Sequence, residues 1–239
     1  MFHHTGQKRT FIHNLRLATL LSLVAGMVNS TGVLALHTLT TNVTGHYAYF
    51  AEEFMKRDYA AAFTFFAFTL FFLLGAFVSN FLTEFIHSKN PKRAHIVPIL
   101  LEMTLLISVG FLGSIATLNA NWIKIMAFIL LFAMGIQNAL VTKISQSTVR
   151  TTHLTGLFTD LGIELSQLFF YKKPEEVTKL KTNIYLRLSI IGFFFIGCVL
   201  GGFLYQTIEI KTLFVASFFL LLALLYDYLR FQFHRLKRK

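Results

Sequence analysis

The sequence has few of the residues on which most catalytic and metal sites depend. Its 239 residues include one cysteine, Cys198, three prolines and 11 acidic residues. One cysteine excludes an intramolecular disulfide and a zinc site built from several thiolates. A Walker loop, a G-x-S-x-G motif and an H-E-x-x-H motif are also missing from the sequence. We therefore expect no enzyme of these classes, no metal ion and no cofactor.

Charge is scarce as well. Only 14% of the residues are charged, against about 25% in soluble domains, while 55% are hydrophobic and 28 are phenylalanine. A chain of this length cannot hide so much apolar surface in water, so the lipid bilayer is its expected surroundings. The formal net charge of +11 would suggest a nucleic-acid partner in a soluble protein. Here the basic residues lie at the ends of apolar segments, where they set membrane topology, and we expect no nucleic-acid partner.

Six apolar segments are long enough to be membrane-spanning helices. A helix needs about 20 residues to cross a hydrocarbon core of roughly 30 Å. The predicted spans are residues 15–36, 59–85, 96–118, 122–141, 184–205 and 213–229. The expected fold is an all-α, polytopic transmembrane helix bundle. Its parts are a basic arm (1–14), a first transmembrane unit (15–118), a second transmembrane unit (119–229) and a basic tail (230–239).

The distribution of lysine and arginine indicates the orientation. With six crossings, all of these residues lie on one side except Lys56, Arg57, Lys124 and Lys211. That side is then cytoplasmic and holds both termini. An alternative with eight crossings, in which residues 38–58 and 151–170 also span, separates the charges less well. Residues 41–54 would extend only about 21 Å as a helix, so we expect broken or re-entrant segments here.

The two transmembrane units resemble each other. Three blocks recur in the same order: residues 26–29 match 135–138, residues 41–45 match 152–156, and residues 71–82 match 193–204. Chance similarity between apolar segments would explain the third block, but not the shared asparagine and the shared Thr-x-x-Thr-Gly. If each unit crosses three times, the second copy is inverted relative to the first, as in many secondary transporters; four crossings would make the copies parallel.

The polar residues of the first two blocks form the predicted binding site. In such transporters the substrate lies near the midplane, where interrupted helices of both halves meet. The predicted site residues are Asn29, Ser30, Thr41, Thr44, Gly45, His46, Gln137, Asn138, Thr152, His153, Thr155 and Gly156. We expect Thr44 and Thr155 to cap half-helices. The alternative for the two asparagines is a purely structural hydrogen bond between helices.

Three of the carboxylates in or beside apolar segments need an interpretation. Glu102 lies about two turns inside the third predicted span. A carboxylate at such a position is costly, which makes it a candidate for coupling transport to a proton or ion. A structural hydrogen bond or ion pair is the alternative. Asp160 and Glu164 are one helical turn apart, and we expect them to be solvated at the membrane interface.

Four segments resemble the YoaK family, a bacterial inner-membrane family of unknown function. They are GMVNSTGVLAL, TTNVTGHYAY, MGIQNALVTK and RTTHLTGLFTDLG. The resemblance implies a multi-pass protein of the bacterial cytoplasmic membrane, and it implies no activity. Two positions depart from the family pattern: Asn29 stands where many members have aspartate, and His46 stands where the pattern has asparagine. If that aspartate binds a proton or cation, Asn29 cannot do so by ionising.

We therefore predict a small secondary transporter or channel-like protein for an unidentified small solute or ion. A membrane-embedded enzyme acting on lipid is one alternative. A regulatory or structural membrane subunit without transport activity is another. A homodimer is compatible with the size of the chain.

Overall fold

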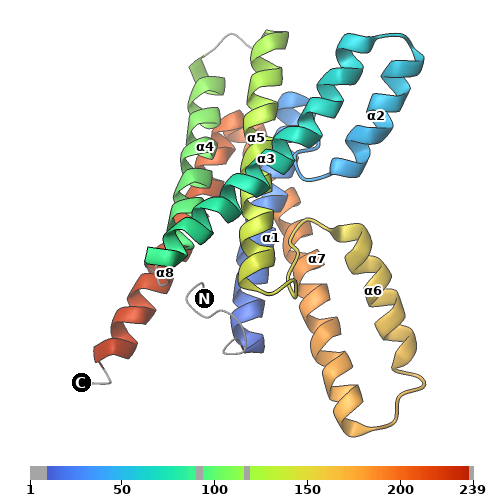
Figure 1. Ribbon diagram of the computed structural model, residues 1–239, viewed down its shortest axis with the longest axis vertical. Helices are drawn as coiled ribbons and strands as arrows, with labels where there is room; N and C mark the ends of the chain where they lie inside the picture. Colours follow the sequence, from blue (N-terminus) through green and yellow to red (C-terminus); the bar gives the residue numbers. More distant parts are fainter. Residues whose placement is uncertain (1–9, 90–93, 116–118, 237–239) are drawn as a thin grey trace.

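The computed structural model is all-helical and describes residues 10–89, 94–115 and 119–236 (Figure 1). The elements in chain order are α1 (Phe11–Leu36), α2 (Val43–Met55), α3 (Tyr59–Lys89), α4 (Ile96–Ile115), α5 (Ala120–Ile144), α6 (Leu154–Gln167), α7 (Pro174–Ile208), the short 3₁₀ helix η2 (Glu209–Lys211) and α8 (Thr212–Leu236). The all-α prediction is confirmed. Most of the predicted basic arm, part of the loop after α3 and the end of the basic tail lie outside the described residues.

Five stretches of the described chain are long and apolar enough to cross a membrane. They are Phe11–Leu36, Tyr59–Lys89, Ile96–Ile115, Ala120–Ile144 and Pro174–Leu229. The last has 56 residues and would be about 84 Å long as one helix, far more than a bilayer requires. It contains α7, η2 and α8, and Figure 1 shows α7 and α8 running in opposite directions. The chain is thus a multi-pass membrane protein.

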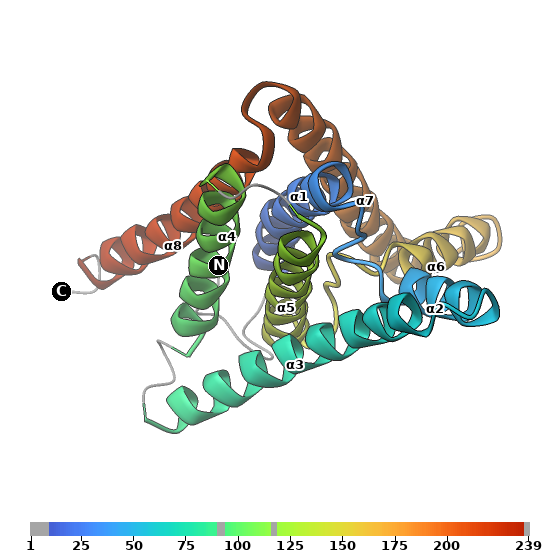
Figure 2. The same cartoon turned by 90° about the horizontal axis from the view of Figure 1, so that it is seen from above.

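The two remaining helices, α2 and α6, are short. They have 13 and 14 residues, which corresponds to about 20 Å each. Both begin near the middle of the bundle (Figure 1). From there α2 runs away from the end where α1 begins, whereas α6 runs toward that end. Figure 2 shows both on the same side of the molecule, opposite α4 and α8.

The centre of the bundle is formed by α1 and α5, which carry most of the fully buried side chains. The long helices α3 and α7 flank this pair (Figure 2). Contacts are most extensive between α1 and α7 and between α3 and α5. A polar bond also joins α1 and α5, because the Gln137 side-chain amide donates to the carbonyl oxygen of Leu21 at 2.7 Å.

Glycines allow both flanking helices to approach the centre closely. A Cβ on Gly197 of α7 would overlap the carbonyl oxygen of Leu23 on α1. A Cβ on Gly75 of α3 would overlap the carbonyl oxygen of Phe132 on α5 in the same way. Small residues are the usual means of bringing backbones together in membranes, where helices gain little hydrophobic energy by leaving lipid.

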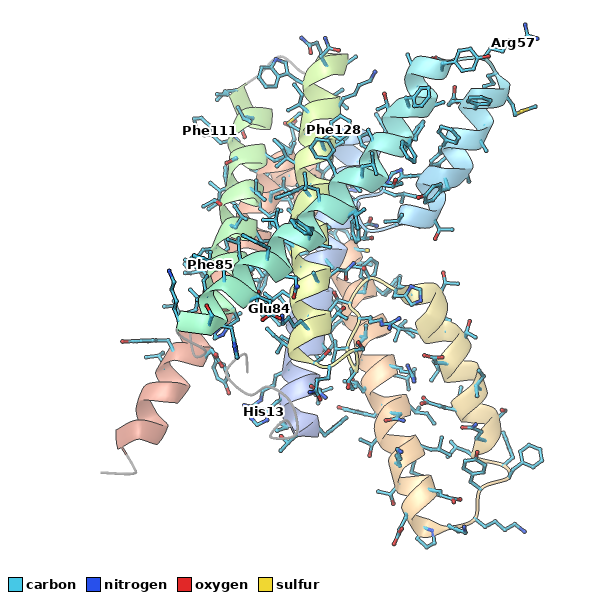
Figure 3. The ribbon with its side chains drawn as sticks, viewed as in Figure 1. His13, Arg57, Glu84, Phe85, Phe111 and Phe128 are labelled. Carbon is cyan, nitrogen blue, oxygen red and sulfur yellow. The ribbon has the colours of Figure 1, made fainter. Side chains whose placement is uncertain are left out.

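The outward faces of the bundle are strongly apolar. Phe77 on α3, Phe111 on α4 and Phe203 on α7 are 58–65% exposed. Figure 3 shows aromatic side chains projecting outward, with Phe85 and Phe111 labelled. So much exposed apolar surface is unusual in a soluble protein and is expected of one that contacts lipid.

The predicted span 184–205 is part of a longer helix in the structure. The charged segment before it begins at Pro174 and forms the first three turns of α7. Pro174 occupies the first turn, where its missing N–H costs nothing, and Glu175 and Glu176 lie near the positive end of the helix dipole. The loop between α6 and α7 is correspondingly short.

Candidate functional site

Each central helix ends in a backbone turn that directs the chain back toward the middle of the bundle. After α1, His37 has φ 52°, and after α5, Gln146 and Ser147 have φ 51° and 62°. Left-handed backbone is uncommon for residues other than glycine and costs about 1 kcal/mol or more. The two loops that follow, residues 37–42 and 145–153, lead into α2 and α6 (Figure 1). We call them the first and the second break.

A hydrogen bond between an asparagine and a threonine closes each break. In the first, the Thr41 hydroxyl donates to Oδ1 of Asn29 at 2.9 Å. In the second, the Asn138 side-chain amide donates to Oγ1 of Thr152. All four residues were predicted from the sequence to belong to a site, and the structure brings them together as two pairs, one in each half. Each bond ties a loop to the helix that precedes it.

The glycine of each Thr-x-x-Thr-Gly motif makes room for the residue at the start of the short helix. Asn42 caps α2 by accepting a hydrogen bond from the Gly45 N–H at 3.0 Å. His153 precedes α6, and a Cβ on Gly156 would overlap its ring. The prediction that Thr44 and Thr155 cap these helices was wrong, because both lie inside the first turn. A cap residue needs non-helical backbone, and asparagine is a stronger cap than threonine.

His46 is buried rather than open to a solvent path. It is 1% exposed, and its Nε2 lies 2.8 Å from the carbonyl oxygen of Leu39, to which it donates. The ring of Phe68 lies 5.3 Å from its own ring. The predicted residue Ser30 is also satisfied locally, because its hydroxyl donates to the carbonyl oxygen of Met27. His46 therefore holds the first break closed.

The second break opens onto a cavity of about 410 Å³ between the loop, α6 and α7. It is lined by Ser147, Thr148, Arg150, His153, Gly156, Leu157, Asp160, Asn183, Leu186 and Arg187. Of the predicted site residues, only His153 and Gly156 line it. The sequence analysis missed most of the other residues that line the cavity, among them Arg150, Asn183 and Arg187. An arginine between apolar residues of a long helix was a usable signal, but Arg187 had been interpreted only as a topological charge.

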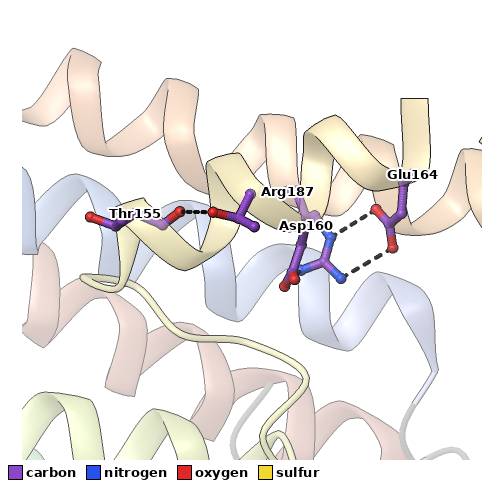
Figure 4. A network of polar contacts seen from close by, with 5 residues as sticks. Thr155, Asp160, Glu164 and Arg187 are labelled. Carbon is purple, nitrogen blue, oxygen red and sulfur yellow. Dashed lines mark hydrogen bonds and ion pairs between the residues drawn. The ribbon is translucent and has the colours of Figure 1, made fainter. Parts of the chain in front are cut away.

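Arg187 joins α7 to α6 through two carboxylates (Figure 4). Its Nε and Nη2 donate to both carboxylate oxygens of Glu164, at 2.8 and 3.1 Å, and its Nη1 donates to Asp160 at 2.9 Å. The Glu164 side chain is 9% exposed. The expectation that both acidic residues are merely solvated was therefore wrong. A bidentate arginine–carboxylate pair fixes the orientation of the two helices as well as their separation.

Glu102 lies elsewhere in the fold. It is 0% exposed on α4, and neither of its carboxylate oxygens has a hydrogen-bond partner among the residues that the structure describes. In both views α4 and α6 lie on opposite sides of the central pair (Figures 1 and 2). Glu102 and His153 therefore do not share a site. Within the described ranges, no group of three or more histidine, cysteine or acidic residues could hold a metal ion.

Comparison with known proteins identifies a family without a known activity. No curated protein matches the chain, and no solved structure matches it. Residues 17–226 match the family described as "Protein of unknown function (DUF1275)". The resemblance to the YoaK family is consistent with this match. Because the match covers most of the sequence, from the first central helix to near the end of α8, the chain belongs to the DUF1275 family.

Proposed function

We propose that this protein is a small secondary transporter or channel-like protein whose polar path runs between the two breaks. The proposed architecture has six crossings and two inverted repeats, with α2 and α6 re-entering the membrane from opposite faces. The proposed location is the bacterial cytoplasmic membrane, with both termini in the cytoplasm. The proposed solute is a small molecule or ion.

The observation that carries this proposal is the pair of bonds Asn29–Thr41 and Asn138–Thr152. The same two residue types, at matching positions of two sequence blocks, close two loops in different halves of the chain. Such loops expose backbone groups that hydrocarbon cannot satisfy, so irregular backbone at this depth is tolerated only inside protein or beside a water-filled path. Both short helices also begin near the middle of the bundle, where inverted-repeat transporters hold their substrates (Figure 1).

The contacts of the glycines support the repeat. Gly26 and Gly135 occupy matching positions, as do Gly75 and Gly197. Gly26 of the first half lies against Phe194 and Gly197 of the second, and Gly135 of the second half lies against Phe72 of the first. Each half thus supplies the flanking helix for the central helix of the other, an exchange that a two-fold axis would generate.

The path is tested by cysteine accessibility in proteoliposomes. In a Cys198→Ala background, single cysteines replace Thr44, Thr155 or, as a lipid-facing control, Leu73, which is 63% exposed. Small charged thiol reagents that do not cross lipid should label Thr44→Cys and Thr155→Cys but not Leu73→Cys. Absence of labelling at both threonine positions would contradict a polar path.

Solute flux tests the role of the two asparagines. Liposome swelling is measured with neutral, anionic and cationic solutes, using Asn29→Leu and Asn138→Leu beside the parent protein. We expect at least one solute that the parent conducts to be excluded by both variants. If both variants conduct every solute that the parent does, the predicted site is wrong. A cysteine at Ser88 that is labelled only from outside intact cells would overturn the six-crossing topology.

A further inference from the structure

The seam between α4 and α8 contains buried ionisable groups that the proposed path does not use. His95, just before α4, is 5% exposed, and its Nε2 lies 3.7 Å from Oδ2 of Asp227 on α8, which is 3% exposed. Glu102 follows His95 by seven residues and lies in the second turn of α4. Its carboxyl lies deeper in the bundle, about 10 Å along the helix axis.

The contacts along the seam place Glu102 between its two ends. The two helices run antiparallel, so His95 meets Asp227 at one end and Gly110 packs against the ring of Phe214 near the other. Between these levels the Ser217 hydroxyl donates to the carbonyl oxygen of Met103 at 3.4 Å. Glu102 lies between the levels of His95 and Gly110 along α4 and is 0% exposed.

Among the side chains that the structure describes, none hydrogen-bonds the carboxyl group of Glu102. The elements packed against α4 are α3, α5, α8 and η2. Their charged or titratable groups, within the part of the chain whose side chains the structure describes, are Tyr59, Glu84, His87 and Lys89 on α3, Lys124 and Lys143 on α5, Tyr226, Asp227 and Tyr228 on α8, and Glu209 and Lys211 on η2. None of them hydrogen-bonds either Glu102 oxygen. The Lys143 ammonium group is bound to Glu84 and Asn80.

The burial of the Glu102 carboxyl group limits the functions that it can have. An ionised carboxylate without a partner is expensive away from water, whereas a carboxylic acid carries no charge and is tolerated. A bound metal cation would need further oxygen ligands, and the described residues supply no such cluster. The remaining use of a buried, unpartnered carboxyl is to hold and release a proton.

We propose that Glu102 is a proton-carrying site that exchanges with water at the end of the bundle where α1 begins, through the His95–Asp227 pair. Water that enters the seam carries one proton from this pair to the carboxylate of Glu102, which becomes a neutral acid and returns the proton by the same route. His13, 7% exposed near the start of α1, lies at the same end (Figure 3). Use of this proton to drive solute movement rests on the transport function proposed above.

Infrared spectroscopy of the reconstituted protein, without any solute, tests the site directly. We expect a band from a protonated carboxyl at neutral pH that Glu102→Gln removes. Glu84→Gln is the matched control, because Glu84 is an exposed carboxylate paired with Lys143. The Glu84 variant should leave the band unchanged. Absence of a band that depends on Glu102 would overturn the proposal.

The role of the pair is tested by exchange into heavy water. The near-isosteric change Asp227→Asn should slow the isotope shift of the Glu102 band by about a hundredfold, the lower end of what a positioned proton-transfer group contributes. Ser217→Ala, on the same face of α8, should leave the rate unchanged. Equal rates in the parent and Asp227→Asn would overturn the assigned route. If every flux assay fails while the Glu102 band is present, the transport proposal is wrong and the proton site is not affected.

Discussion

The two breaks share a backbone plan and differ in chemistry. At the first, α2 packs on α3 through rings: Tyr49 lies 5.2 Å from Phe65, and His46 lies 6.1 Å from Phe65. At the second, α6 packs on α7 through the ion pairs of Arg187 with Asp160 and Glu164. The first break is closed around a buried histidine, whereas the second opens onto a cavity of about 410 Å³.

The proposed repeat assigns this difference to matching positions in the two halves. Counting along the helices from the matched blocks pairs Tyr49 with Asp160 and Phe65 with Arg187. An aromatic contact in one half thus stands where an ion pair stands in the other. Both halves share the turns that return the chain to the middle of the bundle. The charged residues that line the cavity belong to the second half.

The largest expected effect comes from the glycines at which the flanking helices contact the central helices. Gly197→Ala should lower the free energy of unfolding by about 3 kcal/mol, because its Cβ would overlap the backbone of α1. If both halves are built alike, Gly75→Ala should cost a similar amount. The measurement is chemical unfolding in bicelles.

The control for this pair is Gly202→Ala, also on α7, where a Cβ would meet nothing within 4 Å. That change should be neutral or stabilising by up to about 1 kcal/mol, since alanine favours helix over glycine. Similar unfolding free energies for the Gly197 and Gly202 variants would refute the close approach of α7 to α1.

The next largest effect compares the ion pairs between α6 and α7 with the aromatic contacts between α2 and α3. Arg187→Gln should destabilise the protein by about 2 kcal/mol, because it leaves the buried Glu164 without its charged partner. The loss should shrink as salt is added, since the Arg187 side chain is 23% exposed and partly screened.

Phe65→Leu is the matched change in the first half. It also weakens the contact between a short helix and its long neighbour, but it removes no charge. We expect its cost to be independent of salt. A salt-dependent cost at Phe65, or a salt-independent one at Arg187, would contradict the assignment of ionic packing to the second break alone.

The smallest effect separates the two histidines. His46→Ala should cost about 1–2 kcal/mol, because it leaves a cavity and the Leu39 carbonyl without its donor. His153→Ala should change stability by less than about 0.5 kcal/mol, as expected for an exposed residue. Thermal unfolding of both variants measures the difference. Equal costs would mean that the first break is no more tightly closed than the second.

The sequence drew attention to the Thr-Gly motifs and the asparagines, because polar residues stand out in an apolar chain. It predicted the caps poorly: Thr-x-x-Thr-Gly contains several residues able to cap, and only the backbone angles decide that Asn42 caps α2. It also missed the role of Arg187. Glu164 lies 23 residues earlier on another helix, and nothing local indicates that they meet. The cavity residues Ser147, Thr148 and Asn183 carried no signal at all.

What the sequence alone determined is that this is a helical, multi-pass membrane protein with two polar interruptions, since apolar runs of this length have no other stable setting. The tertiary structure decided which helices meet, that α1 pairs with α7 and α3 with α5, and that one break is closed and the other open. The physical reason lies in the solvent. Lipid is as apolar as leucine, so a hydrophobic face does not reveal whether it contacts lipid or another helix. Only the fit of Gly197 against Leu23 and of Gly75 against Phe132, seen in three dimensions, distinguishes the two.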